Sequence, residues 1–567
     1  MPSLLSIQNL SVQFSNEGTK TVAVKNTSIE IKKGELVAIV GESGSGKSVT
    51  ALSLLQLLPK QSTITGKALF FQKEVQPVDL AKLSDSYIKE IRGKKIAMIF
   101  QEPMTSLNPV FTCGRQVMEA IQLHKNISRK AAKQITIELF EKVKLPNPTA
   151  IINRYPHELS GGQKQRVMIA MAISCNPSLL IADEPTTALD VTVQKTILEL
   201  IKELQVQNHM SVILITHDLG VVADIADKIV VMYKGEIVEQ GITKQVLTSP
   251  QHPYTKALLA CRPAGKPKGS YLPVVSDFIG EKKEKVKSPE PSTINHQPST
   301  VLQVKNLKVY LSSRKKLFGK PTDFFKAVDD VSFEVTQGET LGLVGESGCG
   351  KTTLGRTILQ LIKPTEGKII LEGKDITTIK AKALRNMRKD LQIVFQDPYG
   401  SLNPRITIGN AILEPLKVHN VLDNTNQRKE KVMELLEKVS LLPEHFNRYP
   451  HQFSGGQRQR ICIARALALH PSFLIFDESV SALDVSVQAQ VLNLLNDLKK
   501  EFGFTSIFIS HDLSVVRYIS DRILVMHKGK IVERGTAEQI YHHPQNEYTQ
   551  KLIDAIPGKQ FLNLQNG

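Results

Sequence analysis

The sequence has few cysteines and no long apolar segment, and both features exclude classes of protein. Its 567 residues include five cysteines, which are scattered and form no Cys-x-x-Cys pair. A disulfide framework or a cysteine metal site is therefore not expected, and a reducing compartment is the natural setting. No stretch reaches the ~20 apolar residues needed to span a bilayer. The first residues, MPSLLSIQNLSVQF, lack the regions of a signal peptide and alternate like a strand.

Basic residues outnumber acidic ones. The chain has 72 Lys and Arg against 55 Asp and Glu, which gives a formal net charge of +17. Such an excess fits a solvated basic surface, contact with an anionic membrane face or a nucleic-acid partner, and charge alone does not separate these three. The hydrophobic content of 41% is that of an ordinary soluble globular protein, and the length predicts three or four domain units.

One stretch occurs twice, nearly letter for letter. YPHELSGGQKQRVMIAMAISCNPSLLIADEPTTALDVTVQ at residues 155–194 is matched by YPHQFSGGQRQRICIARALALHPSFLIFDESVSALDVSVQ at residues 449–488. The two copies are offset by 294 residues, and a glycine-rich loop ending at Lys47 recurs 304 residues later at Lys351. Self-similarity over such a length indicates a duplicated domain.

The repeats predict two homologous domains, residues 1–263 and 301–560. Between them, residues 264–300 are charged and rich in Pro and Ser, which is the composition of a linker. Each copy begins with alternating strands, followed by an apolar strand, a glycine-rich loop and a helix. A mostly helical stretch follows Gln101 and Gln396, and after it come the helix of the repeated stretch, a strand ending in Asp-Glu and a further apolar strand ending at a His. Strands that alternate with helices predict an α/β fold with a parallel sheet.

Each copy has a phosphate-binding loop between a strand and a helix. The sequences GESGSGKS and GESGCGKT match the pattern G-x-x-x-x-G-K-[ST]. Glycines permit the tight wrap, backbone N–H groups hold phosphates, the lysine reaches the terminal phosphates and the last hydroxyl is a Mg²⁺ ligand. The predicted ATP-binding residues are Gly41, Glu42, Ser43, Gly44, Ser45, Gly46, Lys47 and Ser48, and Gly345, Glu346, Ser347, Gly348, Cys349, Gly350, Lys351 and Thr352.

Acidic pairs and histidines end the apolar strands that follow. A strand that ends in two carboxylates presents a metal ligand and a base at one sheet edge. The first carboxylate suits Mg²⁺, which prefers oxygen ligands, and the second suits the orientation or deprotonation of an attacking water. The residues concerned are Asp183 and Asp477 as metal ligands, Glu184 and Glu478 as bases, and His217 and His511 as γ-phosphate contacts.

A second glycine turn opens the helix of the repeated stretch. Unpaired backbone N–H groups point outward at such a helix start, so the turn predicts another phosphate cradle. Its residues are Ser160, Gly161, Gly162 and Gln163 in the first copy and Ser454, Gly455, Gly456 and Gln457 in the second.

In this order the motifs resemble the nucleotide-binding domains of ABC transporters. The resemblance covers nearly all of residues 1–260 and 300–556. It implies two tandem P-loop NTPase domains, each a RecA-like α/β core with a helical subdomain and an antiparallel β subdomain, with ATP and Mg²⁺ as cofactors. It also adds site residues: the Q-loop glutamines Gln101 and Gln396, with catalytic and metal-binding roles, and the aromatic A-loop residues Phe14 and Tyr310.

Finer detail resembles the oligopeptide/dipeptide importer family, with its two usually separate ATPases fused. The similar segments are FQEPMTSLNP, FQDPYGSLNPR, HPYTKALL and NEYTQKLI. The resemblance implies two integral-membrane permease subunits, an extracytoplasmic substrate-binding protein that acts indirectly, and a peripheral location on the cytoplasmic face of the inner membrane. Di- or oligopeptides are the family's usual substrates, while close relatives carry nickel, glutathione or other solutes.

The chain departs from the family pattern in three places. Members often carry a cysteine cluster for an iron–sulfur centre after the HPYT segment, but this chain has only Cys261 there and no cysteine after Cys462. No iron–sulfur cluster is therefore expected. Phe453 replaces the signature leucine and Ser479 replaces the proline after the second acidic pair. Both positions are peripheral to the chemistry, so both sites are expected to be active.

The resemblance implies that the two domains pair head to tail within the chain. Each phosphate loop would then face the signature of the other domain, whose helix dipole is aimed at the γ-phosphate. ATP binding would close the domains and hydrolysis would reset them. The alternative is a soluble twin-cassette ATPase acting on ribosomes, but such proteins usually have long helical linkers, whereas this one contains Pro289, Pro291 and Pro298. No nucleic-acid partner is expected.

Overall fold

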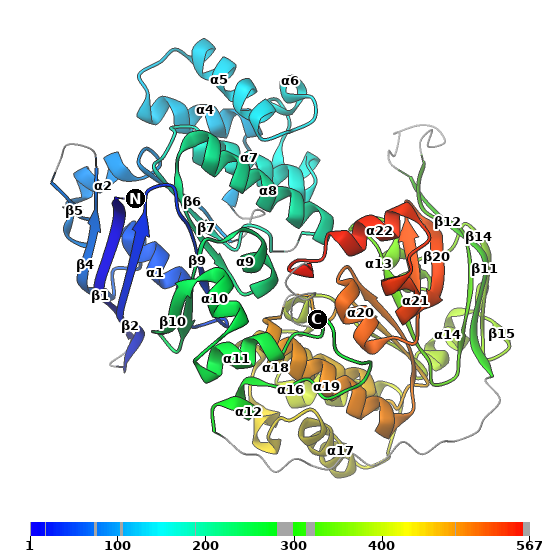
Figure 1. Cartoon of the computed structure of the whole chain (residues 1–567). Helices are drawn as coiled ribbons and strands as arrows, with labels where there is room; N and C mark the ends of the chain where they lie inside the picture. Colours follow the sequence, from blue (N-terminus) through cyan, green and yellow to red (C-terminus); the bar gives the residue numbers. More distant parts are fainter. Residues whose placement is uncertain are drawn as a thin grey trace. The chain divides into compact units, whose positions relative to one another are not determined.

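The chain forms two compact units in a computed structural model (Figure 1). The structure describes residues 2–16, 19–72, 76–101, 106–187, 189–280, 299–312, 324–481 and 483–559. The first unit comprises Met1–Ala260, Val275–Glu281 and Pro557–Gly567, and the second comprises Cys261–Val274 and Lys282–Ile556. Each unit holds one copy of the repeat, which confirms the predicted duplication.

The first unit contains a four-stranded antiparallel sheet, in the order β2-β1-β4-β5, and a six-stranded sheet, in the order β10-β9-β3-β8-β7-β6. In the larger sheet only β10 runs antiparallel to its neighbour. The elements are β1 (Ser3–Asn16), β2 (Thr19–Lys32), β3 (Leu36–Val40), α1 (Lys47–Leu54), β4 (Ser62–Phe70), β5 (Val78–Asp79), η1 (Leu80–Lys82), α2 (Asp85–Ile91), β6 (Ile96–Ile99), α4 (Cys113–His124), α5 (Arg129–Lys142), α6 (Pro148–Ile151), η2 (Pro156–Glu158), α7 (Gly161–Ile173), β7 (Leu179–Asp183), α8 (Val191–Asn208), β8 (Ser211–Thr216), α9 (Leu219–Ile225), β9 (Lys228–Tyr233), β10 (Glu236–Ile242), α10 (Thr243–Thr248), α11 (Pro253–Ala260) and α12 (Val275–Phe278).

The two sheets differ in how far their strands are buried. Every residue of β3, β7 and β8 is buried, as expected for parallel strands covered on both faces. Strand β4 instead alternates exposed and less exposed residues along most of its length, because one face of the antiparallel sheet meets solvent. Figure 1 shows α4, α5 and α6 grouped apart from the β1, β2 and β4 ribbons. The helical stretch predicted after Gln101 is thus confirmed.

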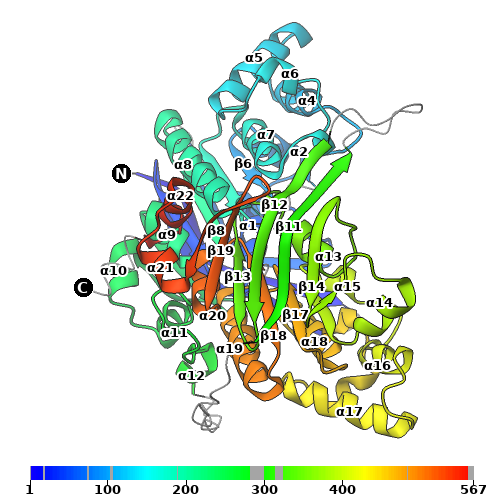
Figure 2. The same cartoon turned by 90° about the vertical axis from the view of Figure 1, so that its right-hand side faces the viewer.

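The second unit repeats this architecture with sheets ordered β12-β11-β14-β15 and β16-β17-β18-β13-β19-β20. Figure 2 shows β11, β12 and β14 of the smaller sheet lying side by side. The elements are β11 (Thr300–Ser312), β12 (Phe324–Thr336), β13 (Thr340–Val344), α13 (Lys351–Ile358), β14 (Glu366–Leu371), β15 (Lys374–Asp375), α14 (Ala381–Met387), β16 (Leu391–Val394), α15 (Pro398–Ser401), α16 (Ile408–Val418), α17 (Thr425–Lys438), η3 (Pro443–Asn447), η4 (Pro450–Gln452), α18 (Gly455–Leu467), β17 (Phe473–Asp477), α19 (Val485–Phe502), β18 (Thr505–Ser510), α20 (Leu513–Ile519), β19 (Arg522–His527), β20 (Lys530–Thr536), α21 (Ala537–His542) and α22 (Glu547–Asp554).

The segment between the repeats is more ordered than a plain linker over 264–300. Residues 261–274 belong to the second unit and contain the fully buried Leu272. The next residues form α12, which packs against α11 in the first unit. The charged, Pro-rich middle that motivated the linker prediction falls at residues 281–298, outside the described residues.

Candidate active site

The first phosphate loop connects β3 to α1. Gly41 has a φ of +153°, and a Cβ there would lie 2.2 Å from the carbonyl oxygen of Met232. Only glycine fits this close approach of two backbones. Lys47 is 5% exposed, and its Nζ donates hydrogen bonds to the carbonyl oxygens of Gly41 at 2.7 Å and Glu42 at 2.8 Å. The loop therefore holds the lysine ammonium inside a glycine-lined cradle that suits phosphate oxygens.

A hydroxyl and a carboxylate meet at the start of α1. The Ser48 hydroxyl donates a hydrogen bond to Asp183 Oδ1 at 3.0 Å, although the two residues lie 135 positions apart. Asp183 ends the buried strand β7, and burial raises the pKa of this carboxyl to about 6 despite the opposing hydrogen bond from Ser48. Two hard oxygen donors side by side form a partial set of the ligands that Mg²⁺ prefers.

Glu184 lies at the centre of a cluster of polar side chains. Its carboxylate accepts a hydrogen bond from Gln101 Nε2 at 3.1 Å and from the Thr187 hydroxyl at 2.8 Å, and His217 Nδ1 lies 3.3 Å away. Burial acts to raise the pKa of Glu184, but the interactions with His217 and Thr187 outweigh it and hold the pKa at about 2. The carboxylate is therefore ionised at neutral pH.

The backbone at Glu184 is held in an uncommon conformation. Its φ is +47°, in the left-handed region that non-glycine residues rarely adopt, and its N–H donates to the carbonyl oxygen of Ile215 at 2.9 Å. Glu478 has a φ of +49° and donates in the same way to Ile509 at 2.9 Å. Strain of this kind persists where the surrounding structure fixes the residue, and it is concentrated at functional sites.

The second unit repeats most of this arrangement, but the buried hydroxyl of Ser481, at the position of Thr187, makes no hydrogen bond. Thr352 donates to Asp477 at 2.8 Å, Gln396 donates to Glu478 at 2.8 Å, and His511 Nδ1 lies 3.5 Å from Glu478. Burial raises the pKa of Asp477, while His511 and the charge of Lys351 together lower the pKa of Glu478 against the effect of burial. Lys351 Nζ donates to the carbonyl oxygens of Gly345 at 2.8 Å and Glu346 at 2.9 Å.

Both signature turns form capping boxes at helix starts. The Ser160 hydroxyl accepts from the backbone N–H of Gln163 at 3.3 Å, and the Gln163 side chain accepts from the N–H of Ser160 at 3.1 Å. Ser454 and Gln457 repeat this exchange at 3.3 Å and 3.0 Å. The capping fixes the first turns of α7 and α18, so the glycine N–H groups have a defined direction.

Three side chains that support the glutamate and the phosphate loops were not predicted from the sequence. Thr187 follows the acidic pair and binds Glu184. The hydroxyl of Tyr254, in the HPYT segment, accepts a hydrogen bond from the backbone N–H of Glu42 at 2.9 Å, and Tyr548 accepts from Glu346 at 3.0 Å. Each tyrosine thus contacts a phosphate loop more than 200 residues away in sequence. The repetition of the HPYT-like segment was the available signal, but nothing local to it pointed to the loop.

The pairing of neighbouring strands shows that the two aromatic residues predicted for the nucleotide sites do not occupy equivalent positions. Phe14 lies opposite Thr21, whereas Tyr310 lies opposite Lys326 and Leu311 lies opposite Phe325. Because Thr21 and Phe325 are 304 residues apart, like the two P-loop lysines, Leu311 occupies the position of Phe14. A shift of one residue moves a side chain to the other face of a sheet. Phe14 and Tyr310 are therefore not equivalent, which corrects their pairing in the sequence analysis.

Comparison with known proteins decides the family. The family described as "ABC transporter" matches residues 24–187 and 328–481, and the one described as "Oligopeptide/dipeptide transporter, C-terminal region" matches residues 238–277 and 532–562. The chain belongs to the ABC transporter ATP-binding proteins. It is accordingly an ATPase that carries two ABC cassettes, with ATP hydrolysis coupled to transport. None of the described helices has the length and apolarity needed to span a bilayer.

Relatives match this chain over nearly its whole length, across both cassettes. The chain is 49% identical over 98% of its length to "Glutathione import ATP-binding protein GsiA" of Pectobacterium atrosepticum, covering 89% of that protein. It is 50% identical to the protein of the same name from Escherichia coli K12, covering 98% of this chain and 90% of the relative. Among solved structures, the dimeric ATP-binding cassette MJ0796 bound to ADP and Pi is 28% identical, with a TM-score of 0.38, covering 42% of this chain and 98% of that one.

Proposed function

We propose that this chain is the ATPase subunit of an importer for glutathione, with short peptides as the competing substrate class. Relatives named for glutathione import are about half identical to it over nearly their whole length. The match to the oligopeptide/dipeptide C-terminal region supports a peptide-like solute, because glutathione is a tripeptide. The importer would also need two permease subunits and an extracytoplasmic binding protein, with this chain at the cytoplasmic face of the inner membrane.

The observation that carries the catalytic roles is the glutamate cluster, in which a glutamine and a histidine lie against the glutamate in each unit. Lys47 would bind the terminal phosphates, and Ser48 and Asp183 would hold Mg²⁺ with Gln101. When bound, Mg²⁺ would neutralise charge that develops on the phosphates. Glu184 would accept a proton from the attacking water. Its ionised carboxylate at neutral pH suits this role.

We propose the same roles in the second unit and a composite arrangement of the two sites. The lysine, hydroxyl, aspartate and histidine contacts of the first unit recur at Lys351, Thr352, Asp477 and His511. The capped turns at Ser160–Gln163 and Ser454–Gln457 would each complete the site of the opposite cassette. A capped helix start offers oriented N–H groups and the positive end of a dipole to a phosphate. Closure on ATP and reopening after hydrolysis would then move the permeases.

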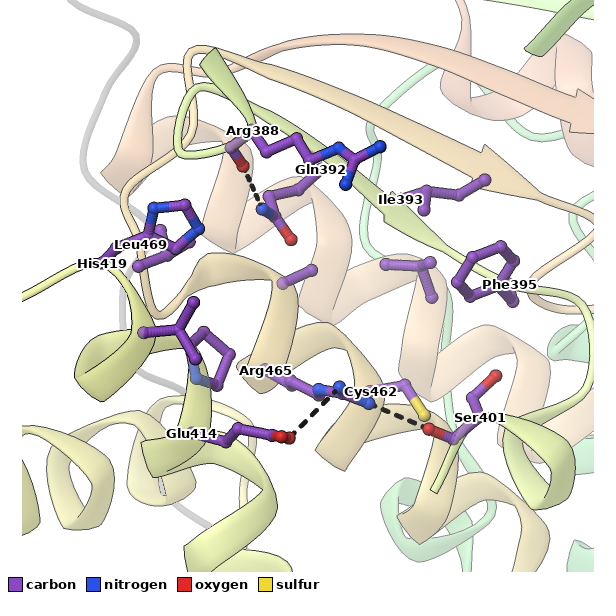
Figure 3. A pocket seen from close by; sticks show the side chains of 14 residues that line it. Arg388, Gln392, Ile393, Phe395, Ser401, Glu414, His419, Cys462, Arg465 and Leu469 are labelled. Carbon is purple, nitrogen blue, oxygen red and sulfur yellow. Dashed lines mark hydrogen bonds and ion pairs between the residues drawn. The ribbon is translucent and has the colours of Figure 1, made fainter. Parts of the chain in front are cut away.

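A cavity in the second unit is our candidate binding surface for a permease subunit. Residues of β16, α16 and α18 line most of a cavity of about 360 Å³. Figure 3 shows their side chains. Arg465 donates a hydrogen bond to the carbonyl oxygen of Ser401 at 2.9 Å and lies 3.6 Å from the Glu414 carboxylate. The exposed Phe395, which directly precedes Gln396 in the sequence, is one of the residues that line the cavity. A permease segment bound here would therefore contact the chain next to a catalytic glutamine.

The experiment that tests the proposal is transport by the purified complex. The tagged chain would be isolated in mild detergent with the membrane proteins that accompany it, reconstituted with its binding protein, and supplied with labelled glutathione. Uptake that needs ATP and is lost in the Glu184→Gln, Glu478→Gln double variant would support the proposal. Accumulation of a labelled dipeptide without glutathione would assign the peptide class instead.

The ribosomal alternative from the sequence analysis receives no support from the comparisons. The relatives are named for import, and the second family match is to a transporter region. Co-purification separates the two functions. Ribosomal proteins in place of multi-span membrane proteins would overturn the importer proposal.

A further inference from the structure

The segment after α11 leaves the first unit and becomes part of the second. Residues 261–274 belong to the second unit, while α11 before them and α12 after them belong to the first. Leu272 is completely buried and Val274 nearly so. A segment with charged and proline-rich sequence around it would not be expected to bury apolar side chains unless it had a fixed binding surface.

That surface is formed by α19 and α20. The N–H of Leu272 donates to Asn493 Oδ1 at 2.9 Å, and Asn493 Nδ2 donates back to the carbonyl oxygen of Leu272 at 2.8 Å. The Asn493 amide therefore satisfies both backbone groups of one residue, as a neighbouring β-strand would. This paired contact fixes the position of the segment along α19.

Further contacts lie along α20. The N–H of Gly269 donates to the carbonyl oxygen of Tyr518 at 3.2 Å, and the Tyr518 hydroxyl donates to the carbonyl oxygen of Ser270. Tyr518 is itself fully buried. Lys268 forms an ion pair with Asp521, just after the helix. The segment thus binds through backbone groups, one buried leucine and one ion pair.

The equivalent segment after the second repeat makes the reciprocal contact. Pro557 lies 294 residues after Pro263, the offset of the repeated motifs, and Pro557–Gly567 belongs to the first unit. The N–H of Gly558 donates to Asp224 Oδ2 at 2.9 Å. Asp224 lies on α9 at the position of Tyr518 on α20, again 294 residues apart. The same site on the same helix therefore receives the segment in both units.

We propose that residues 261–274 are a strap that binds the α19–α20 surface and keeps the two cassettes associated without nucleotide, and that the described residues 557–559 are its counterpart on α9. Exchange of equivalent segments is a known route to a stable pair. Helix α19 follows the loop ending at Asp484, and α20 follows His511, so the strap lies on the two helices that leave the catalytic loops. Release of ATP would then open the sites without separating the cassettes.

The test uses the full chain with a protease site placed within residues 283–297. After cleavage in nucleotide-free buffer, the halves of the 63.0 kDa chain are expected to sediment together, and dilution gives their dissociation constant. Leu272→Asp should raise that constant on the order of 100-fold, because it places a charge in an apolar site. Asn493→Ala should raise it about 10-fold through the loss of two hydrogen bonds. Lys266→Ala, in the same segment, is the matched control and should leave it unchanged.

The melting temperatures of the uncut variants distinguish weaker binding of the strap from misfolding of the chain. Asn493→Ala removes a half-buried amide, so its uncut form should melt within a few degrees of the unmodified chain. Separation of the cut, unmodified halves without nucleotide would overturn the proposal. So would halves of Asn493→Ala and Leu272→Asp that remain associated as tightly as the unmodified ones.

Discussion

The two glycines of the second signature turn should respond in opposite directions to alanine. A Cβ on Gly456 would lie 2.2 Å from Val487 Cγ1, whereas a Cβ on Gly455 would meet nothing within 4 Å. Val487 is on helix α19, where a β-branched side chain has one strongly preferred rotamer and cannot easily turn away. Gly456 is thus a packing requirement between α18 and α19, and Gly455 is not.

The magnitude follows from two opposing effects. Alanine in a helix is more favourable than glycine by up to ~1 kcal/mol, which applies to both positions. Overpacking costs typically ~1–3 kcal/mol and applies only at Gly456. We expect Gly455→Ala to leave the melting temperature unchanged or slightly raised. The difference at Gly456 is a net cost of up to about 2 kcal/mol, so Gly456→Ala should lower the transition of the second unit by up to about 8 °C, at roughly 2–4 °C per kcal/mol.

The first unit supplies an internal comparison. At Gly162 the added Cβ would lie 2.7 Å from Val193 Cγ1, which is a milder clash than at Gly456, and at Gly161 it would lie 3.3 Å from Leu189 Cδ2, a flexible end. Differential scanning calorimetry of all four variants should rank them by these distances. A Gly456→Ala variant that melts at or above Gly455→Ala would refute the reasoning.

Three further predictions concern activity and reactivity. The Glu184→Gln, Glu478→Gln double variant should bind ATP but lose roughly 100-fold or more in turnover, because a general base is removed; near-normal turnover would contradict the assigned roles. Either repeat expressed alone should hydrolyse ATP poorly, and full activity of one would contradict the composite sites. Tyr548→Phe removes the acceptor for a P-loop N–H, so ATP titration should show a loss of about 5- to 10-fold in affinity, and an unchanged affinity would exclude that support.

The burial of the cysteines predicts which thiol is alkylated first. Burial raises the pKa of Cys462 to about 12 and that of Cys113 to about 11, so both remain neutral thiols at pH 8. Cys175 is partly exposed. Brief alkylation at pH 8 followed by mass spectrometry should modify Cys175 first. Equal labelling of Cys462 in the folded chain would show that its site opens to solvent.

The sequence by itself determined the duplication, the α/β class and most of the individual site positions. These follow from local rules. A glycine turn between a strand and a helix has few conformations, an apolar run ending in two acids has its end at a sheet edge, and Ser-Gly-Gly-Gln is a capping box wherever a helix follows. The structure accordingly has Lys47, Asp183 and Ser160 at the element ends that the motifs predicted.

The tertiary structure alone decided how these positions meet. Gln101, Glu184 and His217 converge from three segments, and no local pattern specifies their distances. The Tyr254 contact with the P-loop depends on where helix α11 lies beside the core. The one-residue register difference between Phe14 and Tyr310 depends on pairing with a second strand. The sequence did not predict the strap, because its backbone hydrogen bonds leave no pattern in the sequence. The burial of Leu272 is evident only from the position of the strap on α19 and α20.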